Sequence, residues 1–153
     1  MPNLNEKAPP FSLPDTKKTR VSLGNYQGKQ LVLAFYPAAF TGVCEKELCT
    51  FRDSLSALNK VGAEVVGISV DPPFSNGAFA EKNGLDFPLL SDYSREVVEA
   101  YGVALHDFAG MSGYTAAQRA IFILDGDGII RYKWIAPNPG VEPDYAEIQS
   151  FLS

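Results

Sequence analysis

The sequence predicts an α/β fold with a mixed central sheet, helices on both faces and a β-hairpin near the N-terminus. Two apolar runs typical of buried strands, 31–36 and 64–70, are each followed by a segment with helical signals. That order is typical of parallel βαβ units. Nearer the C-terminus, two further apolar segments at 119–125 and 129–134 flank Asp125-Gly-Asp-Gly128, a turn that joins antiparallel strands.

Local signals define the elements of the first half. Residues 1–10 are polar with three prolines and are expected to run extended over the surface. Segments 11–13 and 20–23 flank a polar loop and are typical of a small β-hairpin. The strand at 30–36 ends before Pro37, which has no N–H to donate to a neighbouring strand.

A helix is predicted from about 45 to 60, because apolar residues recur there at helical spacing, at Leu48, Phe51, Leu55 and Leu58. After the strand at 64–70, Asp71-Pro-Pro73 is expected to cap a helix of about 74–83 that stops at Gly84.

The second half begins with a short extended segment at 87–90 and a helix at about 95–101. Residues 103–117 are rich in Gly, Ala and Ser without a clear period, which predicts a loop crossing the surface. After the antiparallel hairpin, a turn at 137–140 and a helix at 144–152 close the chain. This order of elements is that of a thioredoxin-like fold.

The composition is that of one globular domain spanning residues 1–153, with 46% apolar and 20% charged residues. A net charge of −5 argues against nucleic-acid and anionic-membrane partners. No apolar run is long enough to cross a bilayer, and the N-terminus lacks the pattern of a secretory signal. The expected compartment is therefore the cytoplasm.

The chain has two cysteines and one histidine, His106. In a reducing compartment, two cysteines are more typical of catalysis than of a structural disulfide. They cannot complete a four-ligand zinc site, and neither a nucleophile elbow nor a phosphate-binding glycine motif is present. We expect no metal, no cofactor and no catalytic role for His106.

Cys44 stands where the strand has ended and a helix begins. Free N–H groups and the positive end of the helix dipole favour a thiolate over a thiol at such a position. Its spacing to Leu48 and Leu55 places it in the apolar stripe, so the sulfur should face the protein body at the bottom of a pocket. The alternative is that Cys44 is only a small buried apolar residue.

The segment Pro37-Ala-Ala-Phe-Thr41-Gly-Val-Cys44 matches the Pro-x-x-x-Thr-x-x-Cys motif of peroxiredoxins. With Arg119 on a later strand, the chain resembles this family over nearly its whole length. The resemblance implies a thioredoxin-like fold with the family's additions. It also implies a thiol-dependent peroxidase for hydrogen peroxide and organic hydroperoxides, recycled by thioredoxin or a similar dithiol donor.

The resemblance also implies roles for individual residues. Cys44 would attack the O–O bond and become a sulfenic acid. Thr41 would hydrogen-bond the thiolate and the peroxide, and Arg119 would stabilise the thiolate and the departing oxygen. Pro37 would shield the site from water, and Glu47 would orient the arginine. Simpler structural roles remain open: an N-cap for Thr41, an exposed strand-end charge for Arg119 and a helix-dipole contact for Glu47.

Cys49, five residues after Cys44, resembles the resolving cysteine of Q-type peroxiredoxins (the bacterioferritin comigratory group). Five residues advance an α-helix by about 7.5 Å and rotate it by about 140°. Since a disulfide needs Cα atoms within about 7 Å, the first one or two turns of this helix must unwind before the two cysteines can bond. The alternative is that Cys49 only flanks the helix.

The segment Ala39-Phe-Thr-Gly-Val-Cys44 resembles the sequence of E-type peroxiredoxins, which have a single cysteine, more than that of Q-type members. It leaves open whether an external thiol resolves Cys44 and whether the chain is a monomer or a homodimer. Glu45 would oppose ionisation of Cys44 if its carboxylate pointed inward. Two other activities stay open on the same fold: a disulfide oxidoreductase, against which the lack of Cys-x-x-Cys argues, and a redox sensor or chaperone-like module.

Overall fold

The computed structural model of the chain describes residues 2–152, apart from the side chains of Leu55 and Ser56. The place predicted for Leu55 in the apolar stripe thus lies outside the described residues. The central sheet has the strand order β5-β4-β3-β8-β9. Its strands are β3 (Gln30–Phe35), β4 (Ala63–Ser69), β5 (Leu89–Ser91), β8 (Ala120–Leu124) and β9 (Ile130–Ile135).

The first three of these strands are parallel, and β8 and β9 are antiparallel to their neighbours. The prediction of a mixed sheet is therefore confirmed. The predicted turn at Asp125 is confirmed too, because Asp125 Oδ1 accepts hydrogen bonds from the amides of Asp127 and Ile129 between the two strands.

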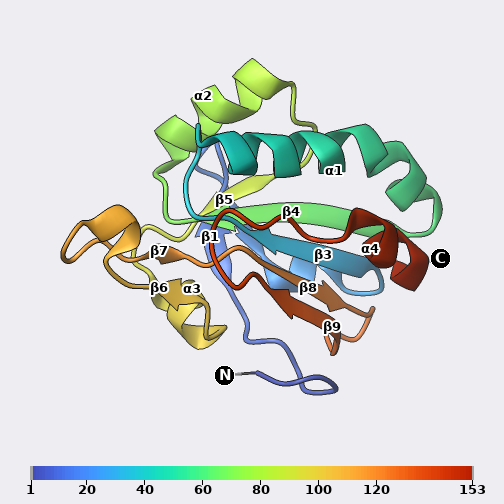
Figure 1. Cartoon of the computed structure of the whole chain (residues 1–153). Helices are drawn as coiled ribbons and strands as arrows, with labels where there is room; N and C mark the ends of the chain where they lie inside the picture. The colour runs from blue at the N-terminus through green and yellow to red at the C-terminus, as the bar shows by residue number, and fades with distance from the viewer. Residues whose placement is uncertain (1, 153) are drawn as a thin grey trace.

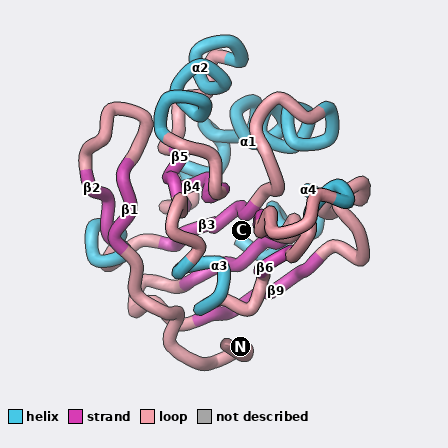
Figure 2. The backbone as a smooth tube through the Cα atoms, turned by 90° about the vertical axis from the view of Figure 1, so that its left-hand side faces the viewer, coloured by secondary structure: helices cyan, strands magenta, loops and turns pink. Residues whose placement is uncertain are grey.

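Both faces of the sheet are covered, because the side chains of β3 alternate between two apolar clusters. Helices α1 (Gly42–Lys60), α2 (Pro73–Asn83) and α4 (Tyr145–Leu152) lie on one face (Figure 1). Helix α3 (Glu96–Ala100) packs on the other face (Figure 2), as does the N-terminal hairpin of β1 (Ser12–Pro14) and β2 (Arg20–Ser22). A short 3₁₀ helix, η1 (Leu23–Tyr26), follows β2.

The region 103–117 is more ordered than its composition predicts. It contains β6 (Ala104–Leu105) paired with β7 (Ala116–Ala117), and a 3₁₀ turn, η2 (Phe108–Gly110), lies between them. Both residues of β7 are fully buried, so a loop crossing the surface is the wrong description of this end of the region. Strands of two residues are too short to show a period in the sequence.

The N-terminal segment lies mostly at the surface, as predicted, but it also pairs with the segment at the start of β9. The amide of Asn5 donates to the carbonyl of Ile130 at 2.8 Å, and the amide of Ala8 donates to the carbonyl of Gly128 at 2.9 Å. Ala8 is buried in the apolar cluster below the sheet. The segment is thus docked by backbone hydrogen bonds that a polar, proline-rich composition does not reveal.

Two helix starts differ from the sequence expectation. Helix α1 begins at Gly42, with Thr41 as its N-cap residue, which places Cys44 within the first turn. Helix α2 has Pro72 as its N-cap residue, so Asp71 does not cap it. The carboxylate of Asp71 instead accepts a hydrogen bond from the amide of Ala39, in the loop before α1. Within residues 2–152, no helix is long and apolar enough to cross a membrane.

Candidate active site

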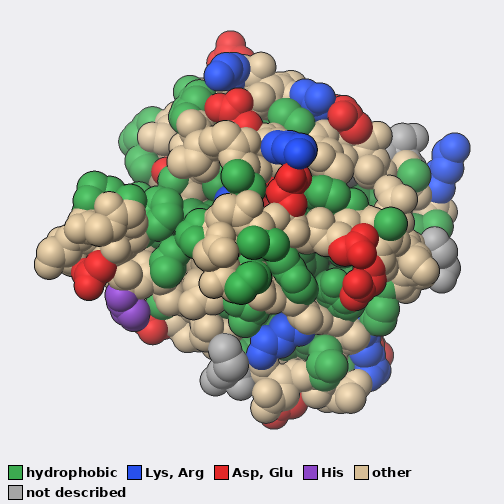
Figure 3. Space-filling view, viewed as in Figure 1, with side chains coloured by type: hydrophobic (Ala, Val, Ile, Leu, Met, Phe, Trp, Pro, Cys, Tyr) green, Lys and Arg blue, Asp and Glu red, His purple; other side chains and the backbone are tan. Residues whose placement is uncertain are grey.

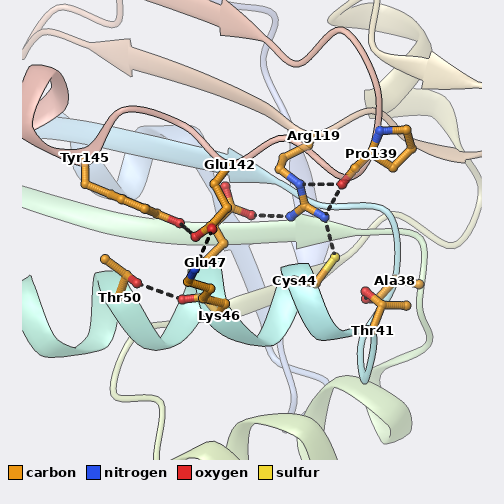
Figure 4. A network of polar contacts seen from close by, with 10 residues as sticks. All are labelled: Ala38, Thr41, Cys44, Lys46, Glu47, Thr50, Arg119, Pro139, Glu142 and Tyr145. Atoms are coloured by element: carbon orange, nitrogen blue, oxygen red, sulfur yellow. Dashed lines mark hydrogen bonds and ion pairs between the residues drawn. The ribbon is translucent and has the colours of Figure 1, made fainter.

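The candidate site lies where β3 ends and α1 begins. β3 leads into the buried residues Tyr36 and Pro37, and a loop to Thr41 then connects to α1. Arg119, directly before β8, and the segment that follows β9 complete the site (Figure 4). The fold thus brings together residues from three separate parts of the chain.

Cys44 is fully buried in the first turn of α1. Its sulfur accepts a hydrogen bond of 3.1 Å from Nη2 of Arg119, which lies 75 residues further along the chain. The sulfur faces the protein body, as the apolar spacing predicted. Because the residue has no exposed surface, it does not lie at the bottom of an open pocket, and that part of the prediction is wrong.

Arg119 donates hydrogen bonds to three residues: Cys44, as described above, Glu47 and Pro139. Its Nη1 donates to Oε1 of Glu47 at 2.8 Å, and its Nε and Nη2 donate to the carbonyl of Pro139 at 3.1 and 2.9 Å. With 2% of its surface exposed, it is not a solvated strand-end charge. Burial works to lower the pKa of Arg119, but Cys44 and Glu47 outweigh that effect, so its pKa is raised and the guanidinium remains charged.

Glu47 is fully buried one turn after Cys44. Its Oε1 accepts from Arg119, and its Oε2 has no hydrogen-bond partner among the described residues. Burial raises the pKa of Glu47 from 4.5 to about 7, although Arg119 favours the ionised form. The carboxyl therefore changes its charge near neutral pH, beside the guanidinium that contacts Cys44.

Thr41 and Pro37 lie at the two ends of the loop before α1. The hydroxyl of Thr41 donates to the carbonyl of Ala38 at 2.9 Å and makes no side-chain cap bond to its helix. The described contacts include no hydrogen bond between Thr41 and Cys44. Since its proton is engaged by Ala38, the Thr41 oxygen presents acceptor lone pairs. Pro37 is buried at the end of β3.

Glu45 does not place its charge against Cys44. Its carboxylate lies 3.6 Å from Nζ of Lys82 on α2. Repulsion between the Glu45 carboxylate and a Cys44 thiolate was expected only if Glu45 pointed inward. The structure shows Glu45 turned towards Lys82 instead.

Cys49 lies on another side of α1 and faces α2. Its thiol donates to Oδ1 of Asn83 at 3.5 Å, and both cysteines are free. The structure therefore does not bring Cys49 to Cys44 while this part of α1 remains helical.

Three residues of the C-terminal segment join the site without having been identified from the sequence. Pro139 accepts from Arg119, as described above. Glu142 lies 3.1 Å from Nζ of Lys46 and accepts from the hydroxyl of Tyr145 at 2.7 Å. The ring of Tyr145 packs edge-on against Phe51 of α1. No sequence signal identifies Pro139, because it acts through a backbone carbonyl that every residue has.

Charged side chains of both signs lie on the surface over the site (Figure 3). On the face shown in Figure 3, basic side chains lie next to acidic ones, in agreement with the pairs Lys46–Glu142 and Lys82–Glu45. No cluster of three or more potential metal-binding side chains occurs among the residues that the structure describes. The reactive groups of the candidate site are therefore a buried thiol, a buried guanidinium and a buried carboxyl group.

Comparison with known proteins shows which family the chain belongs to. The chain matches the AhpC/TSA family over residues 4–133. It belongs to this family. Peroxiredoxin Bcp of Escherichia coli is 41% identical over 126 residues, covering 82% of this chain and 80% of that protein. Chloroplastic peroxiredoxin Q of Sedum lineare is 43% identical over 123 residues, covering 80% of this chain and 63% of that protein.

A solved structure agrees. Peroxidoxin BcpB of Mycobacterium tuberculosis superimposes with a TM-score of 0.86 at 31% identity, covering 97% of this chain and 95% of that one. The resemblance to Q-type peroxiredoxins and the thioredoxin-like fold are both confirmed. The chain is thus a thiol-dependent peroxidase.

Proposed function

We propose that Cys44 is the nucleophile of this peroxidase. The observation that supports the proposal best is the 3.1 Å hydrogen bond from Arg119 to the buried sulfur of Cys44 in the first turn of α1. A cation and the free N–H groups of a helix start both stabilise a thiolate. The other cysteine, Cys49, makes its hydrogen bond to the side chain of Asn83 and not to a cation.

The thiolate of Cys44 attacks one oxygen of hydrogen peroxide or of an organic hydroperoxide. The S–O bond forms as the O–O bond breaks, and the sulfur gives up two electrons and becomes a sulfenic acid. The other oxygen leaves as hydroxide or alkoxide and takes up a proton. Arg119 stabilises that oxygen, Glu47 and Pro139 orient Arg119, and Thr41 accepts a hydrogen bond from the peroxide O–H.

Cys49 then resolves the sulfenic acid. Its thiol loses a proton and the thiolate attacks Sγ of Cys44, so that the S–S bond forms as the S–O bond breaks and the departing hydroxide takes up that proton to become water. Because Cys49 faces Asn83 on α2, the start of α1 unwinds to bring the two sulfurs together. A thioredoxin-like dithiol reduces the disulfide, in a reducing compartment such as the cytoplasm. All these groups lie in one domain of one chain, so the cycle proceeds in a monomer or in each subunit of a homodimer.

One alternative is a one-cysteine cycle in which an external thiol attacks the sulfenic acid. The observation that favours it is the orientation of Cys49 towards Asn83 and away from Cys44.

A peroxide-consumption assay with thioredoxin, thioredoxin reductase and NADPH tests the proposal. We expect Cys44→Ser to abolish turnover, and Cys49→Ser to lose turnover with thioredoxin while still consuming one equivalent of peroxide. Full activity of Cys49→Ser with thioredoxin would favour the one-cysteine cycle. Insulin reduction that exceeds peroxide reduction would instead point to a disulfide oxidoreductase.

A further inference from the structure

Asp71 connects the loop before α1 to a different part of the fold. It follows β4 and precedes α2, yet its side chain does not cap that helix. Its Oδ2 accepts hydrogen bonds of 2.8 Å from the amide of Ala39 and from the hydroxyl of Ser69. Ala39 lies midway between Pro37 and Thr41, so the carboxylate holds the middle of the loop that leads to Cys44.

The position of Asp71 is itself fixed on both sides. Its amide donates to Oγ of Ser69 at 3.2 Å, and its carbonyl accepts from Nδ2 of Asn76 at 3.4 Å. Asn76 is fully buried and accepts a hydrogen bond of 2.7 Å from the hydroxyl of Tyr36, the last residue before Pro37. A polar network thus orients the carboxylate before any reaction begins.

The loop needs such a support because its backbone is strained. Phe40 has a φ of +64°, a left-handed conformation that is costly for a residue with a side chain. Its ring packs edge-on against Phe79 of α2 at 5.2 Å. Phe40 directly precedes Thr41, the N-cap of α1, so the loop conformation and the helix start are coupled.

We propose that Asp71 is a positioning residue that holds the 37–41 loop in the conformation required for peroxide reduction and releases it when α1 unwinds. With the bond to Ala39 in place, the loop keeps Thr41 and Cys44 in register with Arg119. When that bond breaks, the strain at Phe40 is relieved and the start of α1 is free to unwind towards Cys49. The release step rests on the resolving role proposed for Cys49.

The proposal requires that loss of the carboxylate change two steps in opposite directions. In a Cys49→Ser background, we expect Asp71→Ala to slow formation of the Cys44 sulfenic acid roughly tenfold, the effect of losing one hydrogen bond. With Cys49 present, the same substitution should speed the later disulfide step several-fold. Quenched-flow thiol trapping with intact-mass analysis measures both rates in the full chain.

Two variants separate positioning from general destabilisation. Asp71→Asn keeps an oxygen that can accept from the Ala39 amide and should restore both rates to within about twofold of the parent. Asp125→Ala removes a carboxylate that likewise accepts from backbone amides, in the β8–β9 turn, and should change neither rate. Equal rates in Asp71→Ala and the parent, or slowing of both steps, would overturn the proposal.

A measurement on the wild-type chain makes the test independent of whether Asp71→Ala folds. The Ala39 amide should exchange slowly with solvent in the reduced protein and rapidly in the Cys44–Cys49 disulfide form, as followed by NMR. Equal protection in both forms contradicts release of the bond. If no such disulfide forms, the proposed resolving step fails, whereas the sulfenic acid rate still decides whether Asp71 positions Cys44.

Discussion

The guanidinium of Arg119 is the point at which the separate parts of the site meet. It bonds Cys44 and Glu47 of α1 and the carbonyl of Pro139, and it is itself buried. Only a planar group with several fixed donors can satisfy all three acceptors at once. The arrangement explains why a charge so expensive to bury is kept at this position.

Replacement of Arg119 by lysine tests the need for the planar group. Lysine keeps the positive charge but cannot reach all three acceptors, so we expect oxidation of Cys44 by peroxide to slow by roughly 100-fold. Stopped-flow measurement of the reduced protein with hydrogen peroxide gives this rate. Arg131→Lys, at an exposed ion pair with Asp125, serves as the matched control and should leave the rate unchanged.

Glu47 makes a second prediction, on stability. Because burial raises its pKa to about 7, the folded chain keeps a proton that the unfolded chain releases near 4.5. Stability should therefore fall as pH rises from about 4.5 to 7, by on the order of 1–3 kcal/mol relative to Glu47→Gln, which does not titrate. Urea unfolding of both proteins at pH 5 and pH 8 measures this change. A difference that does not vary with pH would contradict it.

Sequence reasoning picked out some of the side chains that the structure brings together here, but it missed the contacts made by Pro139, Glu142, Tyr145 and Asp71. Cys44, Thr41 and Arg119 were identifiable because their side-chain chemistry and spacing match a motif. Pro139 contributes only its carbonyl, and Asp71 resembled the cap of the helix that follows it. Which acceptor an amide finds depends on the path of the folded chain, so neither contact has a local signal.

At the scale of elements, the proposed cycle requires helix α1 to adopt two different conformations. It must be helical for Arg119 to contact Cys44, and it must unwind for Cys49 to reach the same sulfur. The start of this helix at Gly42 was missed because Gly42 and Val43 add nothing to the apolar period that begins at Leu48. The two-residue strands β6 and β7 were missed because no period fits in two residues.

Gly42→Ala tests the requirement for unwinding. Gly42 is exposed, and an added Cβ would meet no atom within 4 Å. Because alanine favours a helix over glycine by up to about 1 kcal/mol, the disulfide step should slow by roughly twofold to fivefold. Formation of the sulfenic acid should stay unchanged.

The matched control is Gly77→Ala in α2, a helix that does not need to unwind. An added Cβ there makes an ordinary contact of 3.7 Å with Thr16. We expect no change in the disulfide rate measured by quenched flow. Equal slowing by both substitutions would show that general stability, and not the start of α1, sets the rate.

At the scale of the molecule, the sheet was predictable and its covering segments were less so. Apolar runs and the turn at Asp125 predicted the strands and the mixed sheet, because each is a local pattern, whereas the order of the strands comes from the structure. The segment after β9 was predicted as a turn and a helix, and it is both. That it also covers Arg119 follows from long-range packing of α4 against α1, which the apolar pattern of α4 alone does not specify.

The close packing of the sheet makes a further prediction. A Cβ added at Gly67 of β4 would lie 2.7 Å from Cδ2 of Leu89 and 3.2 Å from the ring of Tyr36. Gly67→Ala should therefore destabilise the fold by about 1–3 kcal/mol, as overpacking of a core does. Urea unfolding measures the loss. Gly24→Ala, with no atom near the added Cβ, is the control and should cost much less.

The most direct test of the account is a thiol count and an intact mass after one equivalent of hydrogen peroxide, in wild type and in Cys49→Ser. The account predicts that the wild type loses both of its thiols and roughly 2 Da as the Cys44–Cys49 disulfide forms, and that Cys49→Ser gains roughly 16 Da as a stable sulfenic acid. A persistent sulfenic acid in the wild type would remove Cys49 from the cycle. No rapid change in either protein would contradict the assignment of Cys44 as the nucleophile.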